Sequence, residues 1–223
     1  MAEAMDESNG EIRMRGDSES DGDEEKTAAE LLTDLEKAWL NEKFAPEILP
    51  HKSNHVDCLL HHISYMEENL RRLPKGDLRL SIHRMEIDRI RYLVSSYLRM
   101  RLEKIERHVI DILQRESEKS EDERYLTEAE YKFATEYAVN METLFRSLVL
   151  QHLPPNQQGL EADKLAIRPN MSAHVFLRAN KKINGVLIPG TVDEEVDFLE
   201  GSQHIIQYTA VADLVKEGAV QLI

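Results

Sequence analysis

Residues 78–118 read LRLSIHRMEIDRIRYLVSSYLRMRLEKIERHVIDILQRESE and hold the longest helical pattern of the chain. Apolar residues recur there at steps of three and four, the spacing of one face of an α-helix, at Ile82, Met85, Ile90, Leu93, Val94, Tyr97, Leu98, Leu102, Ile105, Val109 and Ile112. The pattern predicts a single helix of roughly 60 Å at about 1.5 Å per residue. Its apolar stripe is wider than a coiled-coil seam, so we expect the helix to pack on several neighbours. A helix of this length overhangs a domain of this size, which predicts that part of the stripe meets another chain.

Three shorter helical patterns accompany this stretch. Thr27-Ala-Ala-Glu30 matches a capping box, and Pro46 ends the helix that follows it. The second pattern occupies roughly residues 53–73. Another capping box, Thr127-Glu-Ala-Glu130, opens the last pattern, which stops at Leu153-Pro-Pro155. The sequence therefore predicts an N-terminal four-helix domain, with one very long helix, over residues 26–153.

Beyond this domain the pattern changes to that of short strands. Residues 154–171 contain three prolines and one glycine and are predicted to form a linker. The β-prone runs that follow, bounded by turn residues, are His174–Arg178, Ile183–Ile188, Glu195–Leu199, Gln203–Tyr208 and Val220–Ile223. Glu200-Gly-Ser202 is expected to close a hairpin between two of these strands, and Ala210–Lys216 to form a short helix.

Residues 172–223 are thus predicted to form a small β-rich C-terminal domain, and the fold class is α+β. A unit of roughly 50 residues is small for a domain that folds alone. We therefore expect it to lean on a larger surface.

The composition is that of an acidic soluble protein. Lys and Arg number 28 against 42 Asp and Glu, a net charge of −14, which disfavours nucleic-acid binding over the whole surface. The single cysteine, Cys58, excludes a disulfide framework and fits a reducing compartment. Met1–Glu11 lacks the apolar stretch of a secretory signal, and no apolar run approaches the ~18 residues of a membrane span. These features predict a cytosolic or nuclear protein that does not have a membrane as a partner.

Residues 1–25 form an acidic segment, with ten acidic residues against two arginines, a balance of −8. Large apolar side chains are nearly absent, so we expect a disordered tail. Ser18 and Ser20 each precede an acid by three residues, which predicts phosphorylation by an acid-directed kinase; an unmodified, solvated tail is the alternative. Asp17-x-Glu19-x-Asp21-Gly22 resembles the start of a calcium loop, but Ala28 stands where that loop needs a bidentate glutamate. We therefore expect no calcium site.

The sequence lacks the motifs that would mark an enzyme. The phosphate-loop, dinucleotide-binding, nucleophile-elbow and HExxH zinc motifs do not occur. Two pairs spaced by four, His51 with His55 and Cys58 with His62, have the spacing of a metal site on a helix. Neither a third ligand nor a group to orient a Cys–His nucleophile follows at a suitable spacing, and a polar helix face is the plainer interpretation. We predict no catalytic residue, cofactor or metal site.

The basic residues concentrate in one stretch. From Arg71 to Arg107, eleven Lys and Arg face five acids, a balance of +6 within a chain of −14. Three interpretations stay open: a surface for an acidic protein partner, a face for nucleic-acid phosphates, or a solvated helix laced with ion pairs. Aromatic residues do not alternate with these bases as a platform for single strands requires. A nucleic-acid-binding module is therefore the alternative to a protein interface.

Several specific segments carry a resemblance to a known family. They are 36–46 (EKAWLNEKFAP), 66–72 (MEENLRR), 89–99 (RIRYLVSSYLR) with 101–106 (RLEKIE), 152–156 (HLPPN), 201–204 (GSQH) and 218–223 (GAVQLI). These segments closely resemble the Sld-five-type subunits of the GINS complex. The resemblance covers about residues 27–223, and the acidic tail departs from it.

The resemblance implies a function and a set of partners. It implies a helical domain followed by a small β-rich one, and a nuclear, non-catalytic subunit that assembles with three other GINS subunits into a heterotetramer. It further implies that the heterotetramer joins the minichromosome maintenance ring and its Cdc-forty-five partner in the replicative DNA helicase, for initiation and elongation of replication. Contact with DNA is expected to be indirect or weak.

The resemblance also points to interface residues. Those expected to meet a partner are Trp39, Phe44, Arg91, Tyr97, Leu98, Arg101, Leu102, Ile105, Leu222 and Ile223. Trp39 and Phe44 would anchor the first helix, with ordinary core packing as the alternative. The residues of the long-helix motif would pack between subunits, and Leu222 and Ile223 would seat the β-rich domain on the assembly.

Overall fold

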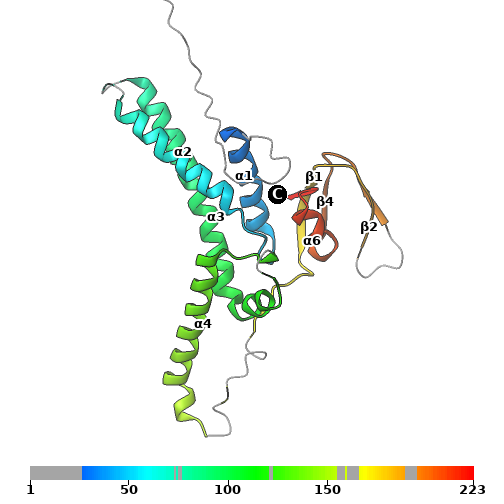
Figure 1. Ribbon diagram of the computed structural model, residues 1–223. Coiled ribbons are helices and arrows are strands. Elements are labelled where there is room, and N and C mark those ends of the chain that lie inside the picture. The colour runs from blue at the N-terminus through cyan, green and yellow to red at the C-terminus, as the bar shows by residue number, and fades with distance from the viewer. Residues whose placement is uncertain are drawn as a thin grey trace, which may run out of the picture.

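The computed structural model describes residues 27–72, 74, 77–120, 123–154, 159, 166–188 and 195–223. Long helices come first and short strands follow, which confirms the α+β fold class (Figure 1). The helices are α1 (Ala28–Phe44), α2 (Ser53–Arg72), α3 (Leu78–Ser117) and α4 (Glu128–Leu148), with the 3-10 turn η2 (Leu150–His152) after α4. The strands are β1 (His174–Ala179), β2 (Ile183–Leu187), β3 (Glu195–Phe198), β4 (Gln203–Gln207) and β5 (Val220–Leu222), and α6 (Tyr208–Lys216) precedes β5. The predicted acidic tail, with Ser18 and Ser20, and much of the predicted linker lie outside the described residues.

Both predicted capping boxes are present. At α1, the Glu30 N–H donates to Thr27 Oγ1 at 3.3 Å, and the Thr27 N–H donates to Glu30 Oε2 at 2.7 Å. Thr127 and Glu130 make the same reciprocal pair of bonds at α4. Each box satisfies N–H groups that the first helical turn leaves without a partner.

The helix α3 is the spine of the helical part. Its 40 residues carry two apolar clusters in succession. The first buries Ile87 and Ile90 against α1 and α2, and the second buries Ile105 and Val109 against α4 and the loop before α2. The width of the stripe predicted this packing on several neighbours. The backbone leaves helical values at His108, within the second cluster (φ −124°, ψ 27°).

The strands form two small sheets. The first has the order β4–β1–β5, with both pairings antiparallel, and the second is the antiparallel pair of β2 and β3. The predicted hairpin through Glu200–Ser202 was wrong, because β3 and β4 belong to different sheets. The Gly201 N–H (residue φ +79°) donates to Ala179 O at 2.8 Å, and the Ala179 N–H donates to Ser202 O at 3.0 Å. The turn therefore extends the pairing of β1 with β4.

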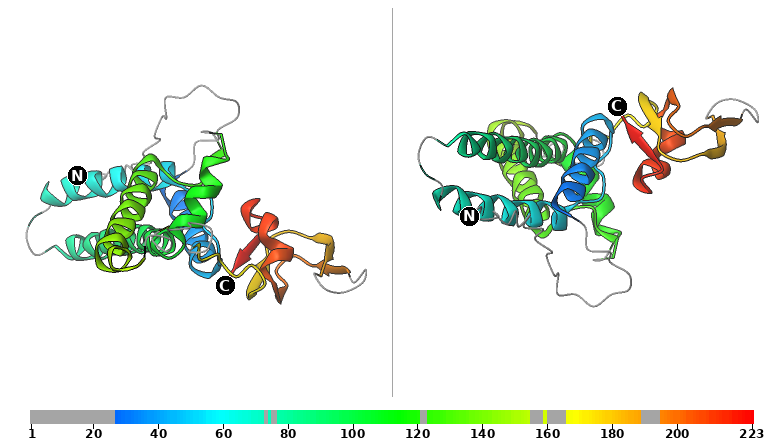
Figure 2. Two further views of the ribbon diagram at one scale, coloured as in Figure 1. Left: turned by 90° about the horizontal axis from the view of Figure 1, so that it is seen from below. Right: turned by 90° about the horizontal axis from the view of Figure 1, so that it is seen from above.

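The β-rich part packs against the C-terminal end of α1. Ala45 and Leu49, which follow α1, belong to the same buried cluster as Leu177, Tyr208 and Leu222 of the β-rich part. The backbone N–H of Leu222 also donates to the side-chain oxygen of Asn41 at 2.8 Å. Seen from above, α1 lies between the α2–α3 pair and the strands (Figure 2).

Candidate interaction surfaces

Four of the predicted interface residues are buried within this chain. The exposed fraction is 2% for Tyr97, 1% for Arg101, and 0% for both Ile105 and Leu222. Tyr97 and Ile105 lie in the two apolar clusters along α3, and Leu222 lies in the cluster of the β-rich part. The prediction that these four side chains touch a partner is corrected, because neighbours from the same chain already cover them.

The other predicted interface residues remain accessible and stay proposals: Trp39, Phe44, Arg91, Leu98, Leu102 and Ile223. Trp39 is half-buried, and its indole N–H donates to Ser96 Oγ at 2.9 Å. Its ring also meets Tyr92 edge-on, so Trp39 fixes α1 against α3 in addition to any outward role. The Arg91 side chain pairs with Glu67 across the α2–α3 contact.

The buried Arg101 joins three helices instead of a partner. Its Nε and Nη2 donate to the two carboxylate oxygens of Glu130 on α4, at 2.7 and 3.0 Å. Its Nη1 donates to Glu42 of α1 at 3.3 Å and to Leu49 O at 2.7 Å, and Nη2 donates to Tyr125 O at 2.7 Å. Burial alone would lower the pKa of Arg101, but Glu130 and Glu42 hold it above its usual range. The guanidinium therefore stays charged and uses all of its donors within the chain.

Glu47, in the loop before α2, connects the helical part to the β-rich part. Its Oε1 accepts the Tyr208 hydroxyl at 3.1 Å and pairs with Lys216 Nζ at 3.0 Å, and its Oε2 lies 3.6 Å from Arg115 of α3. Lys104 Nζ donates to the Glu47 carbonyl at 2.8 Å. Burial, and then the negative charge of Glu47, raise the pKa of Tyr208 well above its usual value. The buried Glu47 carboxylate thus binds Tyr208 and Lys216 of the β-rich part and Arg115 of the helical part.

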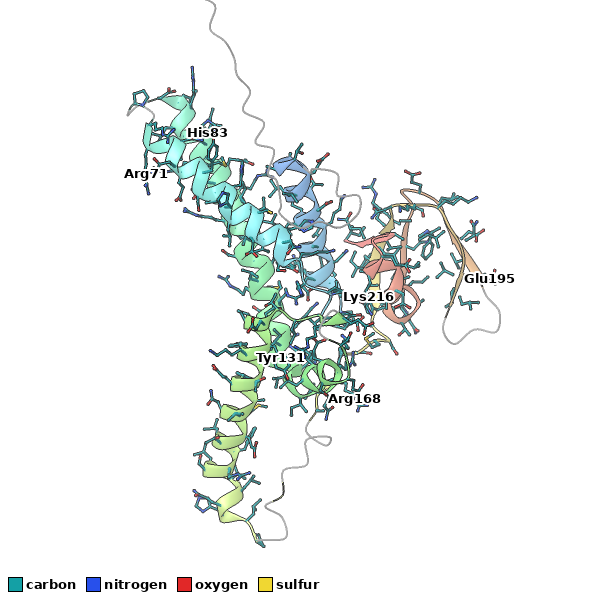
Figure 3. All side chains as sticks on the ribbon, in the orientation of Figure 1. Arg71, His83, Tyr131, Arg168, Glu195 and Lys216 are labelled. Carbon is teal, nitrogen blue, oxygen red and sulfur yellow. The ribbon has the colours of Figure 1, made fainter. Side chains whose placement is uncertain are left out.

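A cleft of about 400 Å³ lies beside this junction and is lined by residues that include Glu47, Asp111, Arg115, Lys119 and Lys216. Its charged side chains compensate one another, since Arg115 lies 3.1 Å from Asp111 and Lys216 lies 3.0 Å from Glu47. Lys216 is labelled where α6 faces the helices (Figure 3). We interpret the cleft as a seam between the two parts, because its acids and bases are occupied with each other.

The apolar face of α4 continues beyond the point where the described residues cover it. Ala134 is fully buried, and the same face continues through Met141 to the last turns of the helix. There Leu144, Phe145, Leu148 and Val149 are 54%, 44%, 63% and 50% exposed. The C-terminal half of α4 stands away from the other labelled helices and strands (Figure 1). Sequence reasoning found this helix but missed the surface, because the pattern shows which face is apolar and not whether the chain covers it.

The outer face of the three-stranded sheet has a smaller apolar patch. Phe176 of β1 lies directly opposite Ile205 of β4, and these side chains are 58% and 59% exposed. Ile223 is also exposed, and its N–H donates to Phe176 O at 3.1 Å. An antiparallel sheet commonly turns polar side chains to solvent on its outer face, so this patch is a second candidate surface.

The basic stretch does not present a continuous positive face. Arg101 is buried, Lys104 pairs with Glu42 at 2.9 Å, and Arg89 pairs with Glu86 at 2.8 Å and with Glu36 at 3.2 Å. Within this stretch, the arginines that are exposed and make no ion pair with the described residues are Arg79, Arg84, Arg99 and Arg107. Much of the stretch is therefore the ion-paired helix that the third interpretation expected.

Within the described ranges, no helix is both long and apolar enough to cross a membrane. In that same part of the chain, no group of three or more His, Cys, Asp or Glu side chains is arranged to hold a metal ion. His51 instead lies 3.0 Å from the Ser53 hydroxyl through Nδ1, and Cys58 is exposed.

Comparison with known families gives two matches that together span most of the described chain. Residues 39–149 match the family described as GINS complex protein helical bundle domain. Residues 169–223 match the family described as DNA replication complex GINS protein SLD5 C-terminus.

Curated relatives cover nearly the whole chain. The chain is 47% identical to the DNA replication complex GINS protein SLD5 of Xenopus laevis over 213 residues, which are 93% of this chain and 96% of that protein. Its identity to the human protein of the same name is 42% over 220 residues, covering 96% of this chain and 99% of that protein. Its identity to the Arabidopsis thaliana protein is 31% over 224 residues, covering 94% of this chain and all of that protein (100%). With both halves of the sequence matched, the chain belongs to the SLD5 family of GINS subunits of the DNA replication complex.

Proposed function

We propose that this protein is a non-catalytic structural subunit of a heterotetrameric GINS complex in the nucleus, and that the exposed apolar face of α4 packs against another subunit. The family membership supports the assembly, and the α4 surface is the observation that carries the interface. We extend the proposal to the larger assembly, in which the heterotetramer joins the minichromosome maintenance ring and its Cdc-forty-five partner.

The α4 surface is suited to an apolar helix from a partner. Fully burying a Leu, Phe or Val side chain stabilises a complex by about 1.5–3 kcal/mol relative to exposure. The four side chains Leu144, Phe145, Leu148 and Val149 are each about half exposed, so covering them contributes several kcal/mol before the costs of association. Monomeric soluble proteins rarely leave a contiguous apolar patch of this kind in contact with water.

A structural role also fits the state of the polar groups. The buried ionisable side chains at the centre of the helical part, Arg101 with Glu42 and Glu130, are engaged in ion pairs. Those at the junction, Glu47 and Tyr208, are engaged with each other. These arrangements hold helices and strands in place. We therefore propose that contacts with DNA are indirect or weak and that any catalysis belongs to a partner.

Substitution on the α4 face tests the assembly. The variant Leu144→Glu with Leu148→Glu, co-expressed with the three other GINS subunits, is expected to lower the yield of intact tetramer by more than about tenfold, because two carboxylates would have to be desolvated at the interface. Native mass spectrometry of the purified complex measures the yield, and circular dichroism checks that the helices remain.

The chain offers a matched control on the same helix. Val139 is 56% exposed, but it lies about 140° and 180° around α4 from Leu144 and Leu148 at about 100° per residue. Val139→Glu is therefore expected to leave the tetramer intact. An undiminished tetramer carrying both glutamates would contradict the α4 interface, and a chain that recovers no GINS partner at all would contradict the proposed assembly.

A further inference from the structure

The outer edge of β4 offers backbone groups that no described residue binds. The Tyr208 N–H, just after β4, donates to Ala173 O at 2.9 Å. Just before β4, Ser202 O accepts the Ala179 N–H at 3.0 Å. In an antiparallel pair every second residue bonds to the neighbouring strand, so the residues of β4 that alternate with these turn their N–H and C=O groups outward: Gln203, Ile205 and Gln207. We call the outward groups of these three residues the β4 edge.

The opposite edge of the same sheet is covered, whereas no described residue covers the β4 edge. On β5, the Leu222 N–H faces away from β1 and donates to the side-chain oxygen of Asn41 on α1 at 2.8 Å. Proteins commonly protect an open edge with charged side chains, a proline or a bulge. Residues 203–207 read QHIIQ, without Asp, Glu, Lys, Arg or Pro, and they pair with β1 without a register shift. An unprotected edge of this kind is suited to pairing with a further strand.

An apolar row on the outer face of the sheet ends at this edge. Ile205 lies opposite Phe176 of β1, and Phe176 lies opposite Ile223, whose N–H donates to Phe176 O at 3.1 Å. The exposed fractions are 59% for Ile205, 58% for Phe176 and 38% for Ile223. Polar pairs lie on both sides of the row: His174 with Gln207, and Arg178 with Gln203. A strand that joins the β4 edge with an apolar residue opposite Ile205 would extend the row and bury part of that side chain.

We propose that a second copy of this chain binds the β4 edge, with the two β4 strands antiparallel about a two-fold axis at Ile205. The strand is self-complementary in this register, because Ile205 then lies opposite Ile205 of the second copy, and Gln203 opposite Gln207 of the second copy. Each opposed pair would exchange two N–H···O bonds, so every group of the β4 edge finds a partner. The paired segments hold no Asp, Glu, Lys or Arg, so no like charges meet within them. The same patch serves both copies, as a two-fold interface requires.

Pairing at the β4 edge would join the two three-stranded sheets into one continuous sheet. The two apolar rows would then meet end to end at the paired isoleucines, and such cross-strand pairs stabilise a sheet. A strand of 5 residues is short, and it buries less than the ~1,200 Å² of a standard interface. We therefore expect a weak dimer, with a dissociation constant roughly in the micromolar range or higher. The strands stand apart from the C-terminal half of α4 (Figure 1), so the dimer leaves the proposed subunit interface free.

Cysteine cross-linking tests the register of this pairing in the full-length chain. All variants carry Cys58→Ser to remove the native thiol, and Leu144→Glu with Leu148→Glu so that the apolar face of α4 does not join copies. Under mild oxidation Ile205→Cys is expected to form a disulfide-linked dimer. The reason is that the Cα atoms of a hydrogen-bonded pair lie about 5.5 Å apart, within the reach of a disulfide. Non-reducing electrophoresis measures the linked fraction.

The same strand supplies matched controls. Gln203→Cys alone is expected to form little dimer, because Gln203 of the second copy lies as far along the paired strand as Gln207 does, roughly 13 Å at about 3.4 Å per residue. A disulfide needs Cα atoms within about 7 Å of each other. An equal mixture of Gln203→Cys and Gln207→Cys chains is expected to link, since these two positions lie opposite each other in the proposed dimer.

A charge at the two-fold axis tests the dimer without a cross-link. Ile205→Lys, in the same background, places two ammonium groups opposite each other. It is expected to raise the dissociation constant measured by analytical ultracentrifugation at least about tenfold. Leu187→Lys is the control, because Leu187 is 61% exposed, much like Ile205, but lies on β2 in the other sheet. This control is expected to leave the dissociation constant unchanged.

Two results would overturn the dimer directly: failure of Ile205→Cys to link, or equal linking of Ile205→Cys and Gln203→Cys. A chain that stays monomeric, while Ile205→Lys lowers the yield of the proposed tetramer, would also overturn it, because the edge would then bind a different GINS subunit. The cross-linking and ultracentrifugation use this chain alone with its α4 face disabled. Their outcome therefore does not depend on whether the proposed tetramer forms.

Discussion

Arg101 lies where α1, α3 and α4 meet, and its guanidinium makes five hydrogen bonds to groups of this chain. Taking such a charge out of water is costly, and the pairing with Glu130 and Glu42 offsets that cost only while all partners are present. The local motif around Arg101 marked the residue as important but suggested a partner outside the chain. Its actual partners come from segments distant in sequence, which spacing along one helix does not reveal.

Removal of this side chain is expected to destabilise the fold strongly. Arg101→Met leaves Glu130 buried without its cation and leaves Glu42 with Lys104 as its only cation, which costs about 3–5 kcal/mol of unfolding free energy. The exposed Arg99→Met serves as the control and is expected to change it by less than about 0.5 kcal/mol. Urea unfolding followed by circular dichroism measures both. A loss below about 1 kcal/mol for Arg101→Met would mean that the cost of desolvating Arg101 and its two glutamates already cancels the benefit of pairing them.

The pH dependence of the unfolding free energy, measured for the unsubstituted protein and for Arg101→Met, tests whether the loss comes from the pairing of Arg101 with Glu130. Burial would raise the pKa of Glu130, but the hydrogen bond from Arg101 and its charge hold that pKa below the ordinary value of 4.5. The stabilisation from Glu130 is therefore complete above pH 4.5 and is lost as the pH falls through the lower folded value. As the pH falls through this range, the unsubstituted protein is expected to lose stability. Arg101→Met is expected to lose less stability or to gain some, because without Arg101 burial raises the pKa of Glu130 and favours its protonated form in the folded state.

At the scale of elements, signals within short segments of the sequence were enough to predict the helices. Strand pairing and the covering of helix faces depend on contacts between distant residues, which such signals do not reveal. The capping boxes and the three-and-four spacing predicted α1 to α4 closely because each signal lies within one helix. Strand segments were also recognisable, but strand pairing joins distant residues, and the expected hairpin at Glu200–Ser202 was wrong for that reason. The exposed half of α4 escaped prediction likewise, since coverage of a face depends on the whole fold.

The two capping boxes allow a paired prediction. Thr27→Ala and Thr127→Ala each remove a side-chain acceptor from a first helical turn, which costs about 1 kcal/mol of unfolding free energy. Thr127→Ala is expected to cost more, because a hydrogen bond from the Thr127 side chain also favours the ionised carboxylate of Glu130, the partner of Arg101. Thermal unfolding of the two variants under the same conditions measures the difference. Equal losses would show that Arg101 positions Glu130 without help from the cap.

At the scale of the whole molecule, two parts of different class are joined by a small number of polar contacts and one apolar cluster. The sequence predicted a β-rich part too small to stand alone, and Leu222 does lie against the end of α1. It did not predict Glu47 as a connecting residue, because a glutamate beside prolines in a loop is ordinarily solvated. The structure places this carboxylate at 6% exposure, with Tyr208 and Lys216 bound to it.

Removing that carboxylate is expected to loosen the β-rich part selectively. Glu47→Ala leaves the buried Tyr208 hydroxyl without its acceptor, a loss of about 1–3 kcal/mol, and frees Lys216. Hydrogen exchange followed by mass spectrometry should then show faster exchange in β1, β4 and α6, with α2 and the first half of α3 unchanged. Asp213→Ala is the control, because Asp213 is 92% exposed and lies 3.9 Å from Lys216, and it should leave exchange unaltered. Faster exchange throughout the chain would mean that the two parts unfold as one unit, and no change would mean that the apolar cluster alone holds them together.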